Sequence, residues 1–161
     1  LPIVGICLGH QLLAQALGGE VGPMEGPEVG FSTMNVLPAG QTDTILAGVA
    51  WASPQFQRHR YEVKKLPAGA QLLASSDKCK VQVFRAGMRA YGFQYHFEAD
   101  RAMIDAFMSD ARTDLHQSGA TTDEFARALE RHYEMFSRLA DRVCINIATY
   151  LIPRVATAMN I

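Results

Sequence analysis

The residue types between Gly5 and Gly9 could support nucleophilic chemistry. Cys7 stands between the two glycines in Gly-Ile-Cys-Leu-Gly. On a sharp strand-to-helix turn that exposes a nucleophile, we predict that side chains at the positions of Gly5 and Gly9 would collide. Both positions therefore need small residues. The positive end of the following helix would favour the reactive thiolate of Cys7. The alternative is a buried thiol beside glycines that allow close packing.

A second run, Tyr91 to Glu98, supplies a base and a carboxylate. Its pattern alternates, which predicts a strand with the aromatic residues on one face and Gln94, His96 and Glu98 on the other. Residues two apart on a strand have Cα atoms roughly 6.5–7 Å apart, so Glu98 can accept a hydrogen bond from the His96 ring. Such a carboxylate fixes the tautomer and stabilises the imidazolium, as the third member of a triad does. The alternative is a solvated polar face.

Hydrophobic patterning indicates which elements position these residues. The apolar run 1–6 predicts a buried parallel strand. Residues 10–17 have helical spacing and end at Gly18-Gly19, which supplies a left-handed stop. A strand, a tight turn and a helix therefore surround Cys7, as a nucleophile on such a turn requires.

The middle of the chain is predicted to be mainly β-structure. The Gly- and Pro-rich stretch 20–30 predicts a loop, and residues 31–40 predict a strand that ends in a turn. Residues 41–60 support no firm element. Three short strands are expected between 70 and 96, with a hairpin turn at Ala86-Gly87.

The last third of the chain is predicted to be helical. An apolar stripe indicates one helix from Asp100 to about His116. Thr121 and Glu124 form a capping box at the start of a second helix, which is expected to end before Pro153. A strand and helix at the start, β-structure in the middle and helices at the end are typical of an α/β fold.

Composition limits the class of protein. A chain of 161 residues with net charge −1 and 48% hydrophobic residues can fold as one domain, and it has no charge excess for nucleic acid or an anionic membrane. It has no apolar run near the ~20 residues that span a bilayer. Three widely spaced cysteines favour a reducing compartment, so we expect a cytoplasmic protein. No residue spacing is typical of a metal site, and we predict no cofactor.

Two motifs resemble those of the class I glutamine amidotransferases. Residues 5–11, Gly-Ile-Cys-Leu-Gly-His-Gln, match that family's G-x-C-x-G-x-Q elbow, and residues 92–98 carry its His and Glu two apart, with Phe97 in place of the usual Pro. The run 59–70 is similar to its H-x-x-x-V-x-x-L-P-x-G-A segment, and Glu28-Val29-Gly30-Phe31 to its Glu-x-Gly-aromatic loop. The resemblance implies a flavodoxin-like three-layer sandwich, with a mainly parallel sheet, a small antiparallel section and C-terminal helices.

The resemblance also implies a reaction. The Cys7 thiolate would attack the side-chain amide carbon of glutamine, His96 would transfer protons, and Glu98 would hold His96. The N–H of Leu8 would bind the oxyanion together with an N–H from an upstream Gly-rich loop. The residues implied to contact the substrate are Gln11, Arg58, Arg60 and Tyr61.

One departure from the family pattern concerns the subgroup. Many members have Gly-Asp after the His that corresponds to His59, whereas this chain has Arg60-Tyr61. This difference distinguishes the chain from the GMP synthetase subgroup and favours a stand-alone member.

The position of Cys7 also bears on domain organisation. The resemblance implies that several strands precede the elbow, so we expect one N-terminally incomplete domain over residues 1–161, with a motif-bearing core (1–100) and a helical part (101–161). The strand at 1–6 should be central and should expose an apolar edge.

The expected partners are a small-molecule substrate, glutamine or a γ-glutamyl compound, and a synthase subunit or domain that receives ammonia from the reaction. Two alternatives remain open. One is a γ-glutamyl peptidase or hydrolase with the same triad. The other is a non-catalytic binding or regulatory module that retains the fold.

Overall fold

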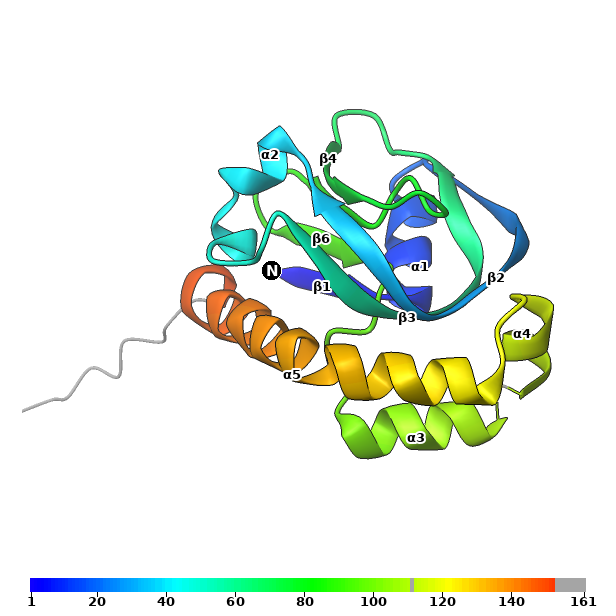
Figure 1. Ribbon diagram of the computed structural model, residues 1–161. Helices are drawn as coiled ribbons and strands as arrows, with labels where there is room; N and C mark the ends of the chain where they lie inside the picture. The colour runs from blue at the N-terminus through cyan, green and yellow to red at the C-terminus, as the bar shows by residue number, and fades with distance from the viewer. Residues whose placement is uncertain (111, 153–161) are drawn as a thin grey trace, which may run out of the picture.

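A computed structural model describes residues 1–110 and 112–152. Its strands form one curled sheet (Figure 1) and are β1 (Ile3–Ile6), β2 (Glu20–Val36), β3 (Ala52–Lys65), β4 (Gln71–Ser75), β5 (Val83–Ala86) and β6 (Ala90–Phe93). The helices are α1 (Leu8–Ala16), α2 (Pro38–Gln41), α3 (Arg101–Asp110), α4 (Arg112–Gln117) and α5 (Thr122–Asn146). A 3₁₀ turn, η1 (Thr44–Leu46), precedes β3, and a π-helical turn, η2 (Ile147–Leu151), follows α5.

The strands are ordered β1-β6-β5-β4-β2-β3. The parallel pair β1–β6 places Gly5 opposite Gly92 and Ile6 opposite Phe93. The α/β class is confirmed, but the expectation of a mainly parallel sheet is wrong for the described residues, whose other strand pairs are all antiparallel. The short connection at Ala86-Gly87 explains the antiparallel pair β5–β6, because such a hairpin can join only antiparallel neighbours.

Strand β1 lies at one edge of this sheet and pairs, among the described residues, with β6 alone. Ile3 is 50% exposed there, and Val4 and Ile6 are partly buried. The strand expected to be central is thus an edge strand in the described chain, with the predicted exposed apolar edge.

Strands β2 and β3 form a long antiparallel ribbon. The loop predicted for residues 20–30 is wrong, because β2 runs through them. The Gly- and Pro-rich composition is accommodated by a register shift between Pro23 and Glu28, across which the ladder resumes with Glu28 opposite His59. Strand β3 occupies much of the stretch 41–60 for which the sequence predicted no firm element. Pairing with a distant strand outweighs the local turn signal here.

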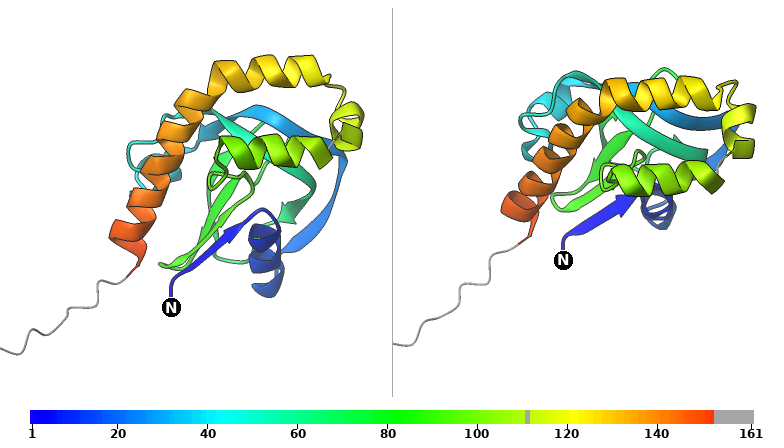
Figure 2. Two further views of the ribbon diagram at one scale, coloured as in Figure 1. Left: turned by 90° about the horizontal axis from the view of Figure 1, so that it is seen from below. Right: turned by 60° about the horizontal axis from the view of Figure 1, so that its bottom comes forward.

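Helices cover the two faces of the sheet. On one face, α1 packs Ala14 into a cluster with Phe84. On the other, Ala140 and Val143 of α5 pack against Phe93. Figure 2 shows α1 and α5 on opposite sides of the sheet. Side chains from the helices on both faces of the sheet therefore contribute to the core.

The C-terminal helices differ in part from expectation. The stripe predicted as one helix over 100–116 forms α3 and α4, with residue 111 outside the described part. The capping box at Thr121 and Glu124 is confirmed at the start of α5. The predicted boundary at Pro153 also lies outside the described residues. Among those described, no helix combines the length and apolar character needed to span a membrane.

Candidate active site

The turn between β1 and α1 holds Cys7 in a strained conformation. Its φ is 50° and ψ −103°, and among the described residues it is the one non-glycine with positive φ. A Cβ at Gly5 would lie 2.4 Å from the Gly9 carbonyl oxygen, so the predicted collision is confirmed there. At Gly9 the prediction is wrong, because a Cβ would meet nothing within 4 Å. The turn thus requires glycine before Cys7, and the strain there marks a functional site.

His96 and Glu98 lie in the segment after β6. The strand ends at Phe93 and the chain then bends, so the predicted strand through residue 98 is wrong. The expected pair is nevertheless formed, with His96 Nδ1 2.7 Å from Glu98 Oε1. The backbone N–H of His96 donates to the Phe56 carbonyl at 2.9 Å, which fixes the bend against β3. Backbone pairing, rather than strand alternation, positions the imidazole.

The electrostatics around His96 favour its charged form. Burial disfavours the imidazolium, but hydrogen bonds with the side chains of Cys7 and Glu98, and the charges of both, outweigh it and raise the pKa of His96 to about 9. One ring nitrogen is hydrogen bonded to the Glu98 carboxylate, and Cys7 is the second group whose interaction raises this pKa. A protonated imidazole beside a thiol is the arrangement that activates a cysteine nucleophile.

Strand β3 passes beside the sulfur and presents backbone groups to it. Cys7 Sγ lies 3.7 Å from the Arg58 carbonyl oxygen. Gln11, on the second turn of α1, donates from Nε2 to the Tyr61 carbonyl at 2.8 Å. Leu8 begins α1, so its N–H is one of the first-turn donors that have no partner within the helix. These groups form one wall around Cys7.

The side chains predicted to bind substrate on β3 point elsewhere. The guanidinium of Arg58 lies over the Phe107 ring, 5.1 Å from its centre. Arg60 forms an ion pair with Asp114 of α4. Tyr61 is half exposed and lines a cavity of about 490 Å³ together with Arg60. The structure thus places the backbone of this segment, rather than its arginine side chains, beside Cys7.

Two residues at the site were not among the predicted site residues. Gln94 is fully buried, and its Nε2 donates to Cys7 Sγ at 3.8 Å. Phe107 of α3 packs against His96, with ring centres 5.6 Å apart. Gln94 lies inside the motif run 92–98, so its position could have drawn attention. Phe107 belongs to an ordinary helical apolar stripe, and nothing in its spacing signals the contact.

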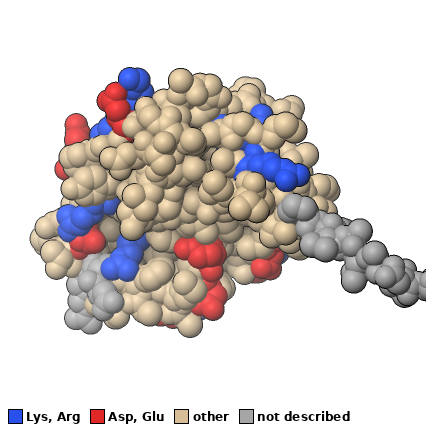
Figure 3. Space-filling view, turned by 180° about the vertical axis from the view of Figure 1, so that it is seen from behind, with Lys and Arg blue, Asp and Glu red and all other residues tan. Residues whose placement is uncertain are grey.

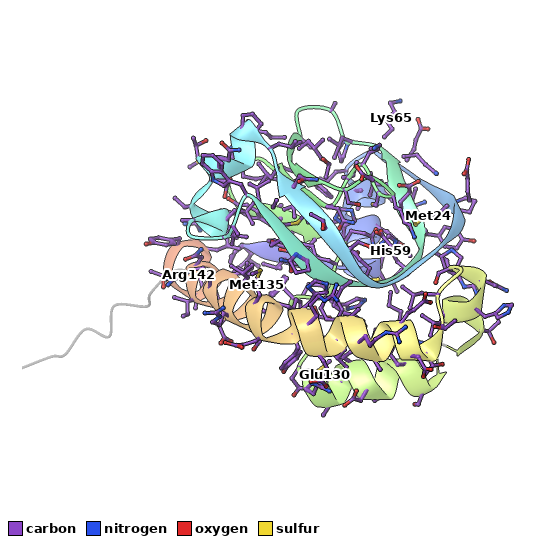
Figure 4. The ribbon with its side chains drawn as sticks, in the orientation of Figure 1. Met24, His59, Lys65, Glu130, Met135 and Arg142 are labelled. Carbon is purple, nitrogen blue, oxygen red and sulfur yellow. The ribbon has the colours of Figure 1, made fainter. Side chains whose placement is uncertain are left out.

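Next to the site lies a buried polar cluster. Among the described residues, one group of potential metal ligands comes within 4.8 Å of one another: Glu28, His59 and Cys79. His59 Nε2 lies 3.0 Å from Glu28 Oε2, and its Nδ1 lies 3.0 Å from the Tyr61 carbonyl oxygen. Protein groups therefore already engage both ring nitrogens of His59. Figure 4 shows His59 in the interior.

The surface charges are mixed where they can be seen together. On the face shown in Figure 3, lysine and arginine side chains lie interspersed with aspartate and glutamate among large uncharged areas. This described face presents no continuous basic stripe of the kind that follows a nucleic-acid backbone.

The fold and the geometry around Cys7 define an α/β protein with a cysteine on a strand-to-helix elbow and a His–Glu pair against it. Comparison with known families agrees: the model of the family "Glutamine amidotransferase class-I" matches residues 1–110. The chain belongs to the class I glutamine amidotransferase family.

Individual relatives refine this placement. A glutamine-hydrolysing GMP synthase subunit from Sulfolobus acidocaldarius is 41% identical over 99 residues, which cover 61% of this chain and 51% of that protein. The chain thus spans about half the length of this relative. The similarity does not support the expectation, drawn from Arg60-Tyr61, that the chain stands apart from the GMP synthetase subgroup.

Solved structures resemble a larger share of the chain. A glutamine amidotransferase from Methylobacillus flagellatus has a TM-score of 0.79 at 26% identity, over 94% of this chain and 64% of that one. One from Thermotoga maritima has a TM-score of 0.79 at 23% identity, over 92% of this chain and 63% of that one, and shows the shared fold. Both matches extend well beyond residue 110, so the C-terminal helices belong to a known architecture.

Proposed function

We propose that this chain hydrolyses the side-chain amide of glutamine through a cysteine thioester, releasing glutamate and ammonia. The observation that supports it is the hydrogen bond of His96 with Glu98, together with the interaction of Cys7 that raises the pKa of His96, on a chain that belongs to a glutamine amidotransferase family. Cys7, His96 and Glu98 are the proposed catalytic residues. Leu8 is the proposed oxyanion donor.

In the first half of the reaction the Cys7 sulfur forms a bond to the amide carbon. The electron pair of the carbonyl moves to oxygen, and the Leu8 N–H at the start of α1 is the proposed donor to that oxyanion. Removing one such donor costs on the order of 100- to 1,000-fold in rate. The C–N bond then breaks as His96, which carries a proton at neutral pH, protonates the departing ammonia.

In the second half the neutral His96 accepts a proton from water, whose oxygen attacks the thioester carbon. The C–S bond breaks, glutamate leaves and the thiolate of Cys7 is restored beside the protonated ring. Glu98 keeps Nδ1 of His96 hydrogen bonded throughout, which holds the other nitrogen toward the sulfur. Protons and electrons therefore return to their starting state after each cycle.

The surroundings of His96 support a small leaving group. The ring of Phe56 lies 6.2 Å and that of Phe107 5.6 Å from the imidazole. Since His96 protonates the departing amine, aromatic walls on this side favour ammonia over an amino acid or peptide. This argues for glutamine and against the alternative γ-glutamyl peptidase or hydrolase.

Gln11, Arg58, Arg60 and Tyr61 are the proposed contacts to the amino-acid end of glutamine, the last three through their backbone. A synthase subunit or domain is the proposed recipient of the ammonia, since the similar Sulfolobus acidocaldarius protein is by name one subunit of a glutamine-hydrolysing synthase. The proposed compartment is the cytoplasm, because Cys7, Cys79 and Cys144 are free thiols.

The test is glutamate release from glutamine by the protein that contains this chain. Cys7→Ala should abolish release, whereas Cys79→Ala, which alters a buried thiol outside the site, should keep it. Hydrolysis of a γ-glutamyl dipeptide in preference to glutamine would favour the peptidase. If a glutamine-analogue electrophile fails to label Cys7 selectively, the chain is the non-catalytic module and the proposal is overturned.

A further inference from the structure

We propose that Gln94 is a further catalytic residue of this site, whose side-chain amide holds the Cys7 sulfur in place and favours its thiolate. The inference rests on the proposed function, in which that sulfur is the nucleophile. It concerns a residue outside the Cys-His-Glu set, and it follows from the contacts of a single buried amide.

The position of Gln94 is fixed by the sheet. It directly follows β6, its backbone N–H donates to the Gln82 carbonyl at 2.8 Å, and its side chain is fully buried. The neighbouring carbonyl of Phe93 accepts a hydrogen bond from the Cys7 N–H at 2.8 Å. Backbone hydrogen bonds therefore fix both Cys7 and Gln94 relative to β6. The Gln94 amide and the Cys7 sulfur consequently have little freedom to move apart.

The hydrogen bonds determine which end of the amide faces the sulfur. Gln11 Nε2 donates to the Tyr61 carbonyl at 2.8 Å and to Gln94 Oε1 at 3.1 Å. Because a carbonyl oxygen can only accept, Gln11 must present its NH₂ group to both partners. Gln94 then presents its oxygen to Gln11 and its own NH₂ group to Cys7 Sγ, 3.8 Å away.

This orientation matters for the charge on the sulfur. The Arg58 carbonyl, 3.7 Å from Cys7 Sγ, can accept from a thiol S–H but offers nothing to a thiolate. Gln94 and the protonated His96 are donors, so they stabilise the negative sulfur. The same donors act again when the thioester breaks and the sulfur leaves as an anion. Gln94 therefore serves both halves of the cycle.

The other titratable groups near the sulfur come from three elements. His96 and Glu98 follow β6, and Arg58 lies on β3 with its guanidinium over Phe107. His10 of α1 is fully buried, and its desolvation, with a smaller Coulombic contribution from His59, lowers its pKa to about 4. His10 thus stays neutral over the pH range of the test, and Gln94 contributes an uncharged donor that does not itself titrate.

The test compares the pH dependence of Cys7 alkylation by iodoacetamide, followed by peptide mass spectrometry. Gln94→Glu has nearly the same shape but replaces the NH₂ donor with a carboxylate. We expect the pH of half-maximal alkylation to rise by about one unit, and the rate at pH 7 to fall about tenfold. Gln94→Met, which is apolar and of similar length, should shift the profile in the same direction by a smaller amount.

The matched control is Gln55→Glu. Gln55 is also a buried glutamine, on β3, but its amide bonds the Ser53 hydroxyl at 3.0 Å. It should leave the Cys7 pH profile unchanged, and thermal melts confirm that each variant is folded. If Gln94→Glu does not fold, Gln94→Met decides the question.

The outcomes separate the two proposals. If wild-type Cys7 reacts no faster than glutathione, the proposed function fails. If wild-type Cys7 reacts selectively, but folded Gln94 variants keep its pH profile, the role of Gln94 is overturned and the proposed function stands.

Discussion

Among the described residues, two groups of cysteine, histidine and glutamate can be compared, and one of them is the proposed catalytic group. Each has a histidine ring nitrogen within 3.0 Å of a carboxylate oxygen. The first group is Cys7, His96 and Glu98, and the second is Cys79, His59 and Glu28. The side chains of His96 and Glu98 are 13% and 34% exposed, whereas those of His59 and Glu28 are 1% exposed each.

The two sulfurs have opposite surroundings. Cys79 is fully buried and donates to the Val81 carbonyl, 3.6 Å away; burial, then the charges of Glu28 and Glu62, raise the pKa of its thiol far above its usual range. Cys7 instead stands at a helix N-terminus, and its sulfur accepts a hydrogen bond from the Gln94 amide. We therefore expect the same three residue types to give a reactive thiol in one group and an inert thiol in the other, according to which groups donate to the sulfur.

The largest difference is expected in thiol reactivity. Under native conditions iodoacetamide should label Cys7 on the order of 1,000-fold faster than Cys79, because the thiolate is the nucleophile and Cys79 is buried as a thiol. Mass spectrometry of the peptides measures both rates. In denaturant the two should react alike. Equal rates in the folded protein would remove the distinction between the two groups.

Removing each carboxylate should give opposite results. Glu98→Gln should lower glutamate release about 100-fold, because His96 loses its orienting partner, while the protein stays folded. Glu28→Gln should lower the free energy of unfolding by about 3 kcal/mol, because it breaks a fully buried pair with His59. Denaturant unfolding and enzyme assays on both variants check this. A large loss of stability in Glu98→Gln would contradict it.

The smallest expected effect is the pH dependence of stability. The pKa of His96 is raised from its usual 6.5 to about 9, so the folded protein holds this proton more tightly than the unfolded chain. Its stabilising contribution is fully present below about pH 6.5 and is lost as pH rises through about 9. Melting temperatures of the wild type should therefore fall over this window more steeply than those of His96→Gln. Parallel curves would show that the pair does not contribute.

Part of the candidate site could be predicted from the sequence, because short motifs determine its local geometry. The glycine before Cys7 indicates an elbow, because the close approach of the Gly9 carbonyl leaves no room for a side chain at Gly5. The spacing of His96 and Glu98 indicates their pair even though the predicted strand ends early. The alternating pattern predicts Gln94 on the polar face of that strand. The contact of its amide with the Cys7 sulfur, however, depends on the bend of the chain after β6.

Much of the fold depends on pairing between distant residues. The stretch 20–30 has the composition of a loop, yet it pairs with β3 at positions far along the chain, from Gly30 with Gln57 to Glu20 with Lys65, and no local signal reports such a partner. The apolar stripe from Met103 to Leu115 contains neither Gly nor Pro, so nothing in it indicates that α3 and α4 are separate helices.

Phe107 connects the proposed catalytic residue His96 to the helical half of the chain. The motifs lie in the first hundred residues, but the ring against His96 belongs to α3, which is fastened to α5 by the ion pair of Arg101 with Glu130 and by the Tyr133 hydroxyl, which accepts the Arg101 N–H at 2.9 Å. Under the proposed function, substitutions between α3 and α5 would act on His96 through Phe107 while every motif residue is kept.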